Sequence, residues 1–164
     1  MHFKFVLADK HFCTIPERAY PGDSGMDLHS VENVTISPKS IACVDNGLIL
    51  MISNNKLFNI ANWVLSKLFN FRIVVEAQIR PKSGLALKKW ISIQNTPGTI
   101  DSGYVGNIKV ILRNDGDLPF TVNIGDKVAQ IVFCPVIIPN EIGISDKISK
   151  TDRGSNGFGS TGYK

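Results

Sequence analysis

The stretch NTPGTIDSGYVGNIKVILRN, residues 95–114, reads as two extended arms joined by a tight turn. Its return arm carries the apolar run Val110–Leu112, as expected for a buried strand. Glycines give the bend backbone freedom, and one carboxylate, Asp101, and one phenol, Tyr104, lie where the chain folds most sharply. The pattern predicts a hairpin that is either a pocket for a flat polar ring or an ordinary surface turn.

The composition of the chain predicts one soluble domain built mainly of strands. Its 164 residues are enough for a real core, and 43% hydrophobic and 20% charged residues are ordinary values. The 14 glycines and 8 prolines indicate many turns, as in an all-β fold. The formal charge of +4 suits an anionic ligand, but the lysines and arginines form no continuous stripe. We therefore expect no nucleic-acid partner.

The cysteine content favours a reducing, cytoplasmic environment. The 3 cysteines are odd in number and form no CxxC pair, which predicts neither a disulfide framework nor a zinc cluster. No apolar run approaches the length of a membrane span, and charged residues interrupt the apolar start of the chain. We expect neither a membrane partner nor a secretory signal.

Short apolar segments separated by turns predict strands through most of the chain, at residues 2–8, 34–36, 41–44, 47–52, 71–79, 120–122 and 128–133. One segment departs from this pattern, because apolar residues recur at helical spacing between Leu57 and Leu68. Asn54 or Asn55 is suited to cap such a helix. We predict a helix over Lys56–Asn70, which serves either as an ordinary core helix or as a partner-binding element.

Three further stretches carry polar groups suited to a ligand. Asp27 follows a loop rich in glycine and proline. Residues 80–87, RPKSGLAL, place two cations beside Ser83, so that this segment is an anion cradle, a helix start capped by the serine, or both. Gln130 lies within the apolar strand VAQIVF, where its amide must find a partner in the protein or in a ligand.

The last stretch, TDRGSNGFGSTGYK at residues 151–164, is flexible by composition. It nevertheless carries groups that suit a nucleotide. Arg153 is suited to clamp a phosphate and Phe158 to stack on a base, while the glycines would let backbone amides close over the ligand.

Five stretches, in this order, resemble the five motifs of the homotrimeric dUTP pyrophosphatases, the dUTPase family. They are SGMDL at 24–28, RPKSGLA at 80–86, NTPGTIDSGYVGN at 95–107, GDKVAQIV at 125–132 and DRGSNGFGSTG at 152–162. The resemblance implies an all-β fold, a jelly-roll β-barrel in which three chains share three active sites. It implies a barrel domain over residues 1–150 with a short helical insert at about 54–70, and a closing C-terminal tail over 151–164.

The resemblance also implies an enzyme, a dUTP diphosphatase. This hydrolase converts dUTP to dUMP and pyrophosphate, which supplies dUMP and keeps uracil out of DNA. Asp101 would be the general base that deprotonates a water, and that water would attack the α-phosphorus. The residues implied to contact the nucleoside are Asn95, Thr99, Ile100, Tyr104 and Lys109.

A second set of residues is implied to bind the phosphate chain: Lys82, Ser83, Gly84 and Gln130, with Arg153, Gly159, Ser160 and Thr161 from the tail, while Phe158 would cover the uracil. Mg²⁺ would bridge the phosphates. Asp27 would touch the water shell of this ion rather than the metal, in keeping with an ion that dehydrates reluctantly.

Two departures from the family pattern leave alternatives open. Lys82 stands where the family usually has arginine, so the bidentate fork is lost, and whether Arg80 compensates is left open. The stretch between Gly47 and Arg80 is longer than the family usually has.

The alternatives to a dUTP diphosphatase are a catalytically silent nucleotide-binding or regulatory module, and a dCTP deaminase. Against the deaminase, Ile111 stands where those enzymes place a catalytic glutamate.

Overall fold

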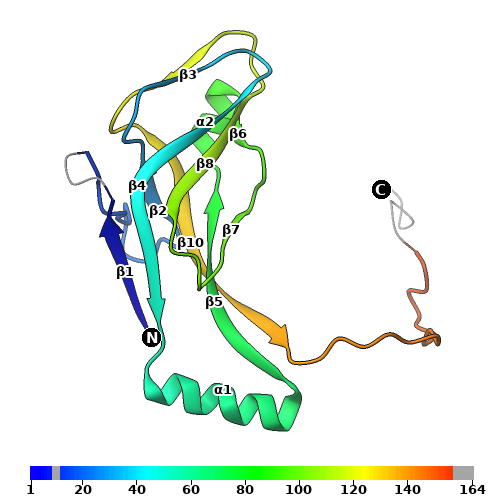
Figure 1. Cartoon of the computed structure of the whole chain (residues 1–164). Helices are drawn as coiled ribbons and strands as arrows, with labels where there is room; N and C mark the ends of the chain where they lie inside the picture. Colours follow the sequence, from blue (N-terminus) through cyan, green and yellow to red (C-terminus); the bar gives the residue numbers. More distant parts are fainter. Residues whose placement is uncertain (9–11, 157–164) are drawn as a thin grey trace.

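The computed structural model describes residues 1–8 and 12–156, and strands dominate it (Figure 1). The strands are β1 (His2–Leu7), β2 (Met26–His29), β3 (Val34–Ile36), β4 (Ile41–Ser53), β5 (Phe71–Arg80), β6 (Ile91–Ile93), β7 (Gly98–Ile100), β8 (Asn107–Asn114), β9 (Phe120–Val122) and β10 (Lys127–Pro139). The helices of the described residues are α1 (Lys56–Phe69) and α2 (Ser83–Lys89). The predicted all-β class is confirmed, and α1 is the predicted helical excursion.

Two four-stranded antiparallel sheets enclose the hydrophobic core. One sheet has the strand order β1-β4-β8-β6 and the other β2-β10-β5-β7, while β3 pairs with β9. Side chains alternate between the two faces of each strand, so every second residue of the central strands points inward. Val44, Val110, Ile79 and Ile131 are such residues, each at most 3% exposed. The outer faces are thereby left for polar side chains.

The stretch at residues 95–114 is not a paired hairpin, and this part of the prediction is wrong. Strand β7 pairs with β5 in one sheet, whereas β8 pairs with β4 and β6 in the other. The turn between them, closed by a bond of 3.0 Å from the Tyr104 amide to the Asp101 carbonyl oxygen, carries the chain from sheet to sheet. The two arms therefore diverge, and an opening lies between them at the edge of the core.

Strand lengths differ from the predictions at two places. The predicted strands at 41–44 and 47–52 form the single strand β4, whose register against β8 shifts between Asp45 and Ile49. Gly47 occupies this irregularity with a φ of +64°, a left-handed conformation that suits glycine. Strand β10 runs past Pro135 to Pro139, because the whole length of β5 pairs with it, from Gln130 to Pro139. Local sequence signals at 128–133 did not reveal this long-range pairing.

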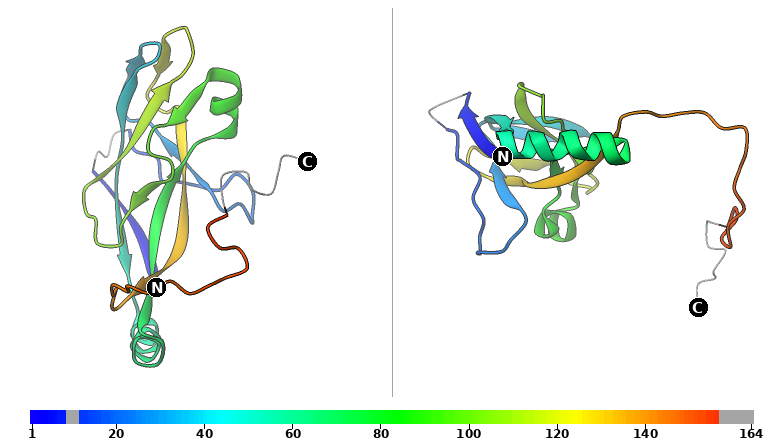
Figure 2. Two further views of the ribbon diagram at one scale, coloured as in Figure 1. Left: turned by 90° about the vertical axis from the view of Figure 1, so that its right-hand side faces the viewer. Right: turned by 90° about the horizontal axis from the view of Figure 1, so that it is seen from below.

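Helix α1 connects the lower ends of β4 and β5 and lies across the base of the molecule (Figures 1 and 2). The side chain of Asn55 caps it by accepting a hydrogen bond of 2.9 Å from the Phe58 amide, and Asn70 ends it in the left-handed conformation. The predicted helix over Lys56–Asn70 is thus confirmed to within one residue. None of its residues is buried, so the prediction of a core helix is wrong. Neither helix of the described residues is long and apolar enough to cross a membrane.

Beyond β10 the chain leaves the body of the molecule and extends away from it (Figure 2). Every described residue from Glu141 to Asn156 is exposed. The hydrogen bonds that the structure gives within this segment are local, such as the 3.2 Å bond from the Arg153 guanidinium to the Asn156 carbonyl oxygen. The described part of the tail therefore contributes nothing to the core.

Candidate functional site

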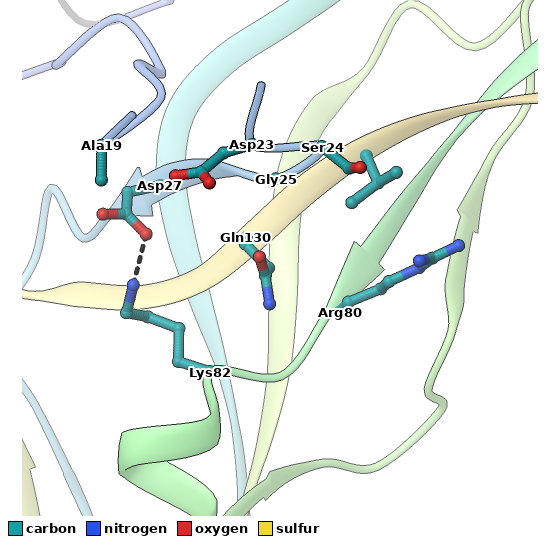
Figure 3. Close-up of a pocket in the computed structure, with 9 residues that line it drawn as sticks. Ala19, Asp23, Ser24, Gly25, Asp27, Arg80, Lys82 and Gln130 are labelled. Atoms are coloured by element: carbon teal, nitrogen blue, oxygen red, sulfur yellow. Dashed lines mark hydrogen bonds and ion pairs between the residues drawn. The ribbon is translucent and has the colours of Figure 1, made fainter. Parts of the chain in front are cut away.

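Most of the predicted site residues of the described chain fall into two groups, each around its own hollow. The first hollow, of about 400 Å³, is lined by Ala19, Asp23, Ser24, Gly25, Asp27, Arg80, Lys82, Gln130 and Val132 (Figure 3). The second, of about 190 Å³, is lined by Thr99, Ile100, Asp101, Tyr104, Asn107, Ile108 and Lys109. An adjoining small hollow of about 50 Å³ adds Asn95 to the second group.

The first hollow lies over the outer face of one sheet. Gln130 of β10 is in register with Asp27 of β2 on one side and with Arg80 of β5 on the other. These side chains therefore form a row across three neighbouring strands. Lys82, just past the end of β5, closes the row beside Asp27. Two acids, Asp23 and Asp27, thus surround one cavity together with an amide and two cations.

Asp27 is the electrostatic centre of this hollow. Its carboxylate forms an ion pair with Lys82 and a second one, of 2.7 Å, with Lys127. Burial acts to raise the pKa of Asp27, but the hydrogen bonds and charges of Lys127 and Lys82 outweigh it, so the pKa lies below the ordinary value of 3.8. Asp27 is therefore a carboxylate at neutral pH, with both of its oxygens engaged.

Gln130 finds the partner expected for its amide within the protein. Its amide nitrogen donates a hydrogen bond of 3.0 Å to the Pro81 carbonyl oxygen, and its side chain also lines the hollow. The amide lies directly against the backbone of Gly25, where a Cβ atom would be 2.0 Å from the amide oxygen. A side chain at this position would therefore displace the amide of Gln130.

The second hollow is the opening between the diverging strands β7 and β8. The backbone of Thr99 and Ile100 forms one wall, and Lys109 forms part of the other. Lys109 lies 3.6 Å from the Asp45 carboxylate, within ion-pair distance. Peptide groups at a short strand edge, together with a cation, can hydrogen-bond a polar ring.

Tyr104 stands over this opening. Its hydroxyl donates a hydrogen bond of 3.1 Å to the Asn107 carbonyl oxygen, and the residue is 47% exposed. The ring covers Gly106 so closely that a Cβ atom there would lie 2.4 Å from the tyrosine oxygen. Gly106 thus allows the ring to lie flat on the turn, leaving its other side to a ligand.

Asp101 projects from the turn at the edge of the second hollow and is exposed. Among the hydrogen bonds of the described residues, its carboxylate takes part in none, although its backbone oxygen accepts from Tyr104. The carboxylate of Asp27, by contrast, forms ion pairs with two lysines. A carboxylate with free oxygens beside a cavity can accept a proton from a bound water.

Several predicted residues do not join either hollow. Ser83 and Gly84 form the exposed first turn of α2, beside Lys82 but outside the lining of the first hollow. Ser83 is not the helix cap, since Lys82 occupies that position without a side-chain cap bond. Arg153 lies on the exposed tail, where its guanidinium bonds only locally. Four tail predictions, Phe158, Gly159, Ser160 and Thr161, lie outside the described residues.

The two hollows belong to opposite faces of strand β5. Arg80 lines the first hollow, whereas its neighbour Ile79 points inward and lines the small cavity next to Asn95. Consecutive residues of a strand point to opposite faces. Within one chain, the two groups of predicted site residues therefore do not form one continuous site.

Sequence reasoning missed Lys127 as a partner of Asp27. Strict alternation would place Lys127, three residues before Gln130, on the opposite face of β10. A register shift between Lys127 and Ala129 turns it to the face of Asp27.

A second missed residue, His29, is in register with Lys127 and has a buried Nδ1 without a hydrogen-bond partner among the described residues. Burial, and then the charge of Lys127, lowers the pKa of His29.

The fold and the two hollows describe an all-β protein with sites for a polar ring and for a negatively charged group. A model of the dUTPase family matches residues 68–162 of the chain. The deoxyuridine 5'-triphosphate nucleotidohydrolase of a Picosynechococcus strain is 43% identical over 162 residues, which cover 99% of each chain. The chain therefore belongs to the dUTPase family.

Solved structures agree with this assignment at the level of the fold. The dUTPase of Staphylococcus bacteriophage 80alpha, solved with dUpNHpp, has a TM-score of 0.77 at 22% identity and covers 98% of both chains. A mutant dUTPase of the S. aureus phage phi11, described with a structural Mg(II) ion, has a TM-score of 0.69 at 22% identity. It covers 90% of this chain and 98% of its own.

Proposed function

We propose that this chain hydrolyses dUTP to dUMP and pyrophosphate, which supplies dUMP and keeps uracil out of DNA. The observation that carries the proposal is the pairing of an unengaged carboxylate, Asp101, with a peptide-lined opening under Tyr104. Relatives named deoxyuridine 5'-triphosphate nucleotidohydrolase, 43% identical over nearly the full length, support the substrate.

Asp101 is the general base in this proposal. It accepts a proton from a water, whose oxygen forms a bond to the α-phosphorus while the bond from that phosphorus to the bridging oxygen breaks. The electron pair of that bond leaves with pyrophosphate. Asp101 suits this role because its oxygens are free of side-chain partners among the described residues and face the second hollow.

Uracil binds between β7 and β8, where the backbone of Thr99 and Ile100 and the side chain of Asn95 contact its polar edge. The opening is small and its inner wall is apolar, which supports exclusion of a methylated base. Tyr104, whose ring covers the turn, packs against the deoxyribose. A 2′-hydroxyl on the sugar would collide with this ring. Lys109 contacts the nucleoside from the opposite wall.

The phosphate chain binds in the first hollow, contacted by Lys82 and Gln130, with Ser83 and Gly84 at its rim. Because the first hollow and the small cavity that adjoins the second hollow lie on opposite faces of β5, a complete site needs the first hollow of one chain beside the second hollow of another. A homotrimer with shared active sites supplies this arrangement. The tail of a third chain closes the site, with Arg153 on the γ-phosphate, Phe158 over the uracil, and Gly159, Ser160 and Thr161 along the phosphates.

Mg²⁺ is the cofactor of this proposal, and when bound it neutralises phosphate charge. The described residues hold no group of three side chains that would bind the ion directly. Asp27 already engages both oxygens with lysines, which fits contact with the water shell rather than with the metal. The triphosphate itself therefore supplies most of the ligands.

We further infer that residues 1–150 form the catalytic domain, that 54–70 is an insert outside it, and that 151–164 is the closing tail. The lack of any buried residue in α1 supports the second assignment. The Picosynechococcus relative aligns over 99% of both chains, so the two proteins have nearly the same length. Free Cys13, Cys43 and Cys134 support a cytoplasmic location.

Hydrolysis of dUTP in isotopically labelled water tests the reaction. The expected result is one labelled oxygen in dUMP and none in pyrophosphate, because water attacks the α-phosphorus. Label in the pyrophosphate, or in free phosphate, would contradict the proposed reaction. The same assay is applied to Asp101→Asn, with Asp117→Asn as the control for loss of a negative charge. Asp117 is an exposed carboxylate that pairs with Lys39 and lines neither hollow.

A further inference from the structure

We propose that Arg80 is a second phosphate-binding cation of this chain, which holds the triphosphate at the end of the first hollow opposite Lys82. This inference rests on the proposed function, because it assigns a further residue to the phosphate part of that site. Three observations carry it: the position of Arg80 in the hollow, the state of its charge, and the bonds that hold it in place.

The position of Arg80 suits a ligand longer than a single phosphate. Lys82 and Arg80 both line the cavity of about 400 Å³, and Gln130 lies between them (Figure 3). The two cationic side chains point to opposite sides of the glutamine. A chain of phosphates that passes over Gln130 would therefore meet a cation at each end.

The two cations differ in the state of their charge. Lys82 is paired with Asp27, whose carboxylate it shares with Lys127, so its charge is partly compensated. Among the described residues, no carboxylate lies within ion-pair distance of Arg80. Arg80 therefore lines the hollow without an ion pair among the described residues, and it attracts an anion without breaking an existing ion pair.

A chain of polar side chains along the outer face of β5 holds Arg80 in place. Glu76 accepts a hydrogen bond of 2.7 Å from the amide nitrogen of Gln78, which fixes the orientation of that amide. The amide oxygen of Gln78 then accepts two bonds from Arg80, of 3.2 Å from Nε and 2.7 Å from Nη2. Nη2 also donates to the Cys134 sulfur at 3.3 Å.

This arrangement leaves donors for a ligand. The hydrogen bonds to Gln78 and Cys134 use Nε and Nη2, and none among the described residues uses Nη1. A guanidinium fixed on one edge and open on another is ordered in advance, so less side-chain entropy is lost on binding. Arg80 thereby supplies the guanidinium chemistry that lysine at position 82 lacks.

The test compares Arg80→Gln with Arg72→Gln, a matched control that removes the same charge from the exposed far end of the same strand. Binding of inorganic tripolyphosphate is measured by calorimetry, and steady-state hydrolysis gives KM for dUTP. Inhibition by deoxyuridine, which lacks phosphate, is measured beside them. Circular dichroism and gel filtration confirm that each variant keeps its fold and assembly.

We expect Arg80→Gln to weaken tripolyphosphate binding by about tenfold or more, the loss typical of a charge-assisted hydrogen bond. KM for dUTP should rise, inhibition by deoxyuridine should stay unchanged, and Arg72→Gln should resemble the parent chain. Arg80→Lys, which keeps the charge and loses the fork, should fall between the two and shows the effect in a variant with little structural risk.

Equal tripolyphosphate binding by Arg80→Gln and Arg72→Gln would overturn the inference, as would a parent chain that binds no tripolyphosphate. A change in deoxyuridine inhibition as large as that in tripolyphosphate binding would show a purely structural role and would also overturn it. The proposed function fails separately, if the parent chain binds tripolyphosphate through Arg80 but releases no pyrophosphate from dUTP.

Discussion

At the scale of single residues, the state of each carboxylate decides what it can do. Asp27 is a stable anion because Lys82 and Lys127 occupy both of its oxygens. Asp101 has no such partners among the described residues and faces a cavity. One acid therefore organises charge, while the other is available to a water. The sequence alone predicted both acids, but it could not predict Lys127, because the bulge that turns this residue depends on strand register.

Asp101→Asn tests the role of the unengaged carboxylate. We expect kcat for dUTP to fall by roughly 10²–10⁴-fold, since the water loses its base, while a non-hydrolysable dUTP analogue still binds. Single-turnover kinetics and calorimetry provide the two readings. A variant with near-normal turnover would remove Asp101 from the catalytic role.

Asp27 gives stability a defined pH dependence. Because the pKa of Asp27 in the folded chain lies below its ordinary value of 3.8, its contribution is present at neutral pH and is lost as the pH falls through the folded pKa. The parent chain should therefore melt at higher temperature than Asp27→Asn at neutral pH, and the gap should shrink in acid. Thermal melts over a pH series measure this gap, and a gap independent of pH would contradict the account.

At the scale of elements, α1 shows how a polar side chain can attach a helix to a sheet. Asn62 donates a hydrogen bond of 2.7 Å to the Ile73 carbonyl oxygen and accepts one of 2.8 Å from the Ile73 amide. The side-chain amide of Asn62 thus makes two hydrogen bonds to the backbone of β5, as a neighbouring strand would. Helical periodicity predicted α1 itself but not this attachment. The position of an asparagine in a helix does not reveal which strand its side chain will contact.

Asn62→Ala tests this attachment. We expect it to lower the free energy of unfolding by about 1–2 kcal/mol, because two partly buried backbone groups lose their partner. Asn59→Ala, on an exposed position of the same helix, is the matched control and should have little effect. Urea denaturation of both variants decides, and equal effects would show that Asn62 does not attach the helix.

At the scale of the whole molecule, the placement of the two hollows on opposite faces of β5 makes a second copy of the chain part of the proposed site. The order of the polar stretches along the sequence predicted a set of site residues, and the segments between them predicted the strand-built fold that the structure has. It did not predict that strands β7 and β8 would join different sheets, because pairing partners depend on contacts far apart in the sequence. The distribution of the site over two faces follows from that pairing.

Deletion of residues 154–164 tests the tail at this scale. We expect activity on dUTP to fall sharply while the melting temperature stays within the error of the parent chain, because the described residues from Glu141 to Asn156 are exposed. Pyrophosphate release and thermal melts are the two readings. A parallel loss of thermal stability would mean that the tail serves the fold rather than the site.

The most direct measurement is pyrophosphate release from dUTP, dTTP, dCTP and UTP, each with and without Mg²⁺. The account predicts release from dUTP alone, enhanced by Mg²⁺, because the opening between β7 and β8 admits uracil, and Tyr104 excludes a 2′-hydroxyl. Release from dCTP or UTP at a comparable rate would contradict the assigned recognition. No release from any nucleotide, with dUTP still bound, would contradict the proposed activity and favour a silent nucleotide-binding module.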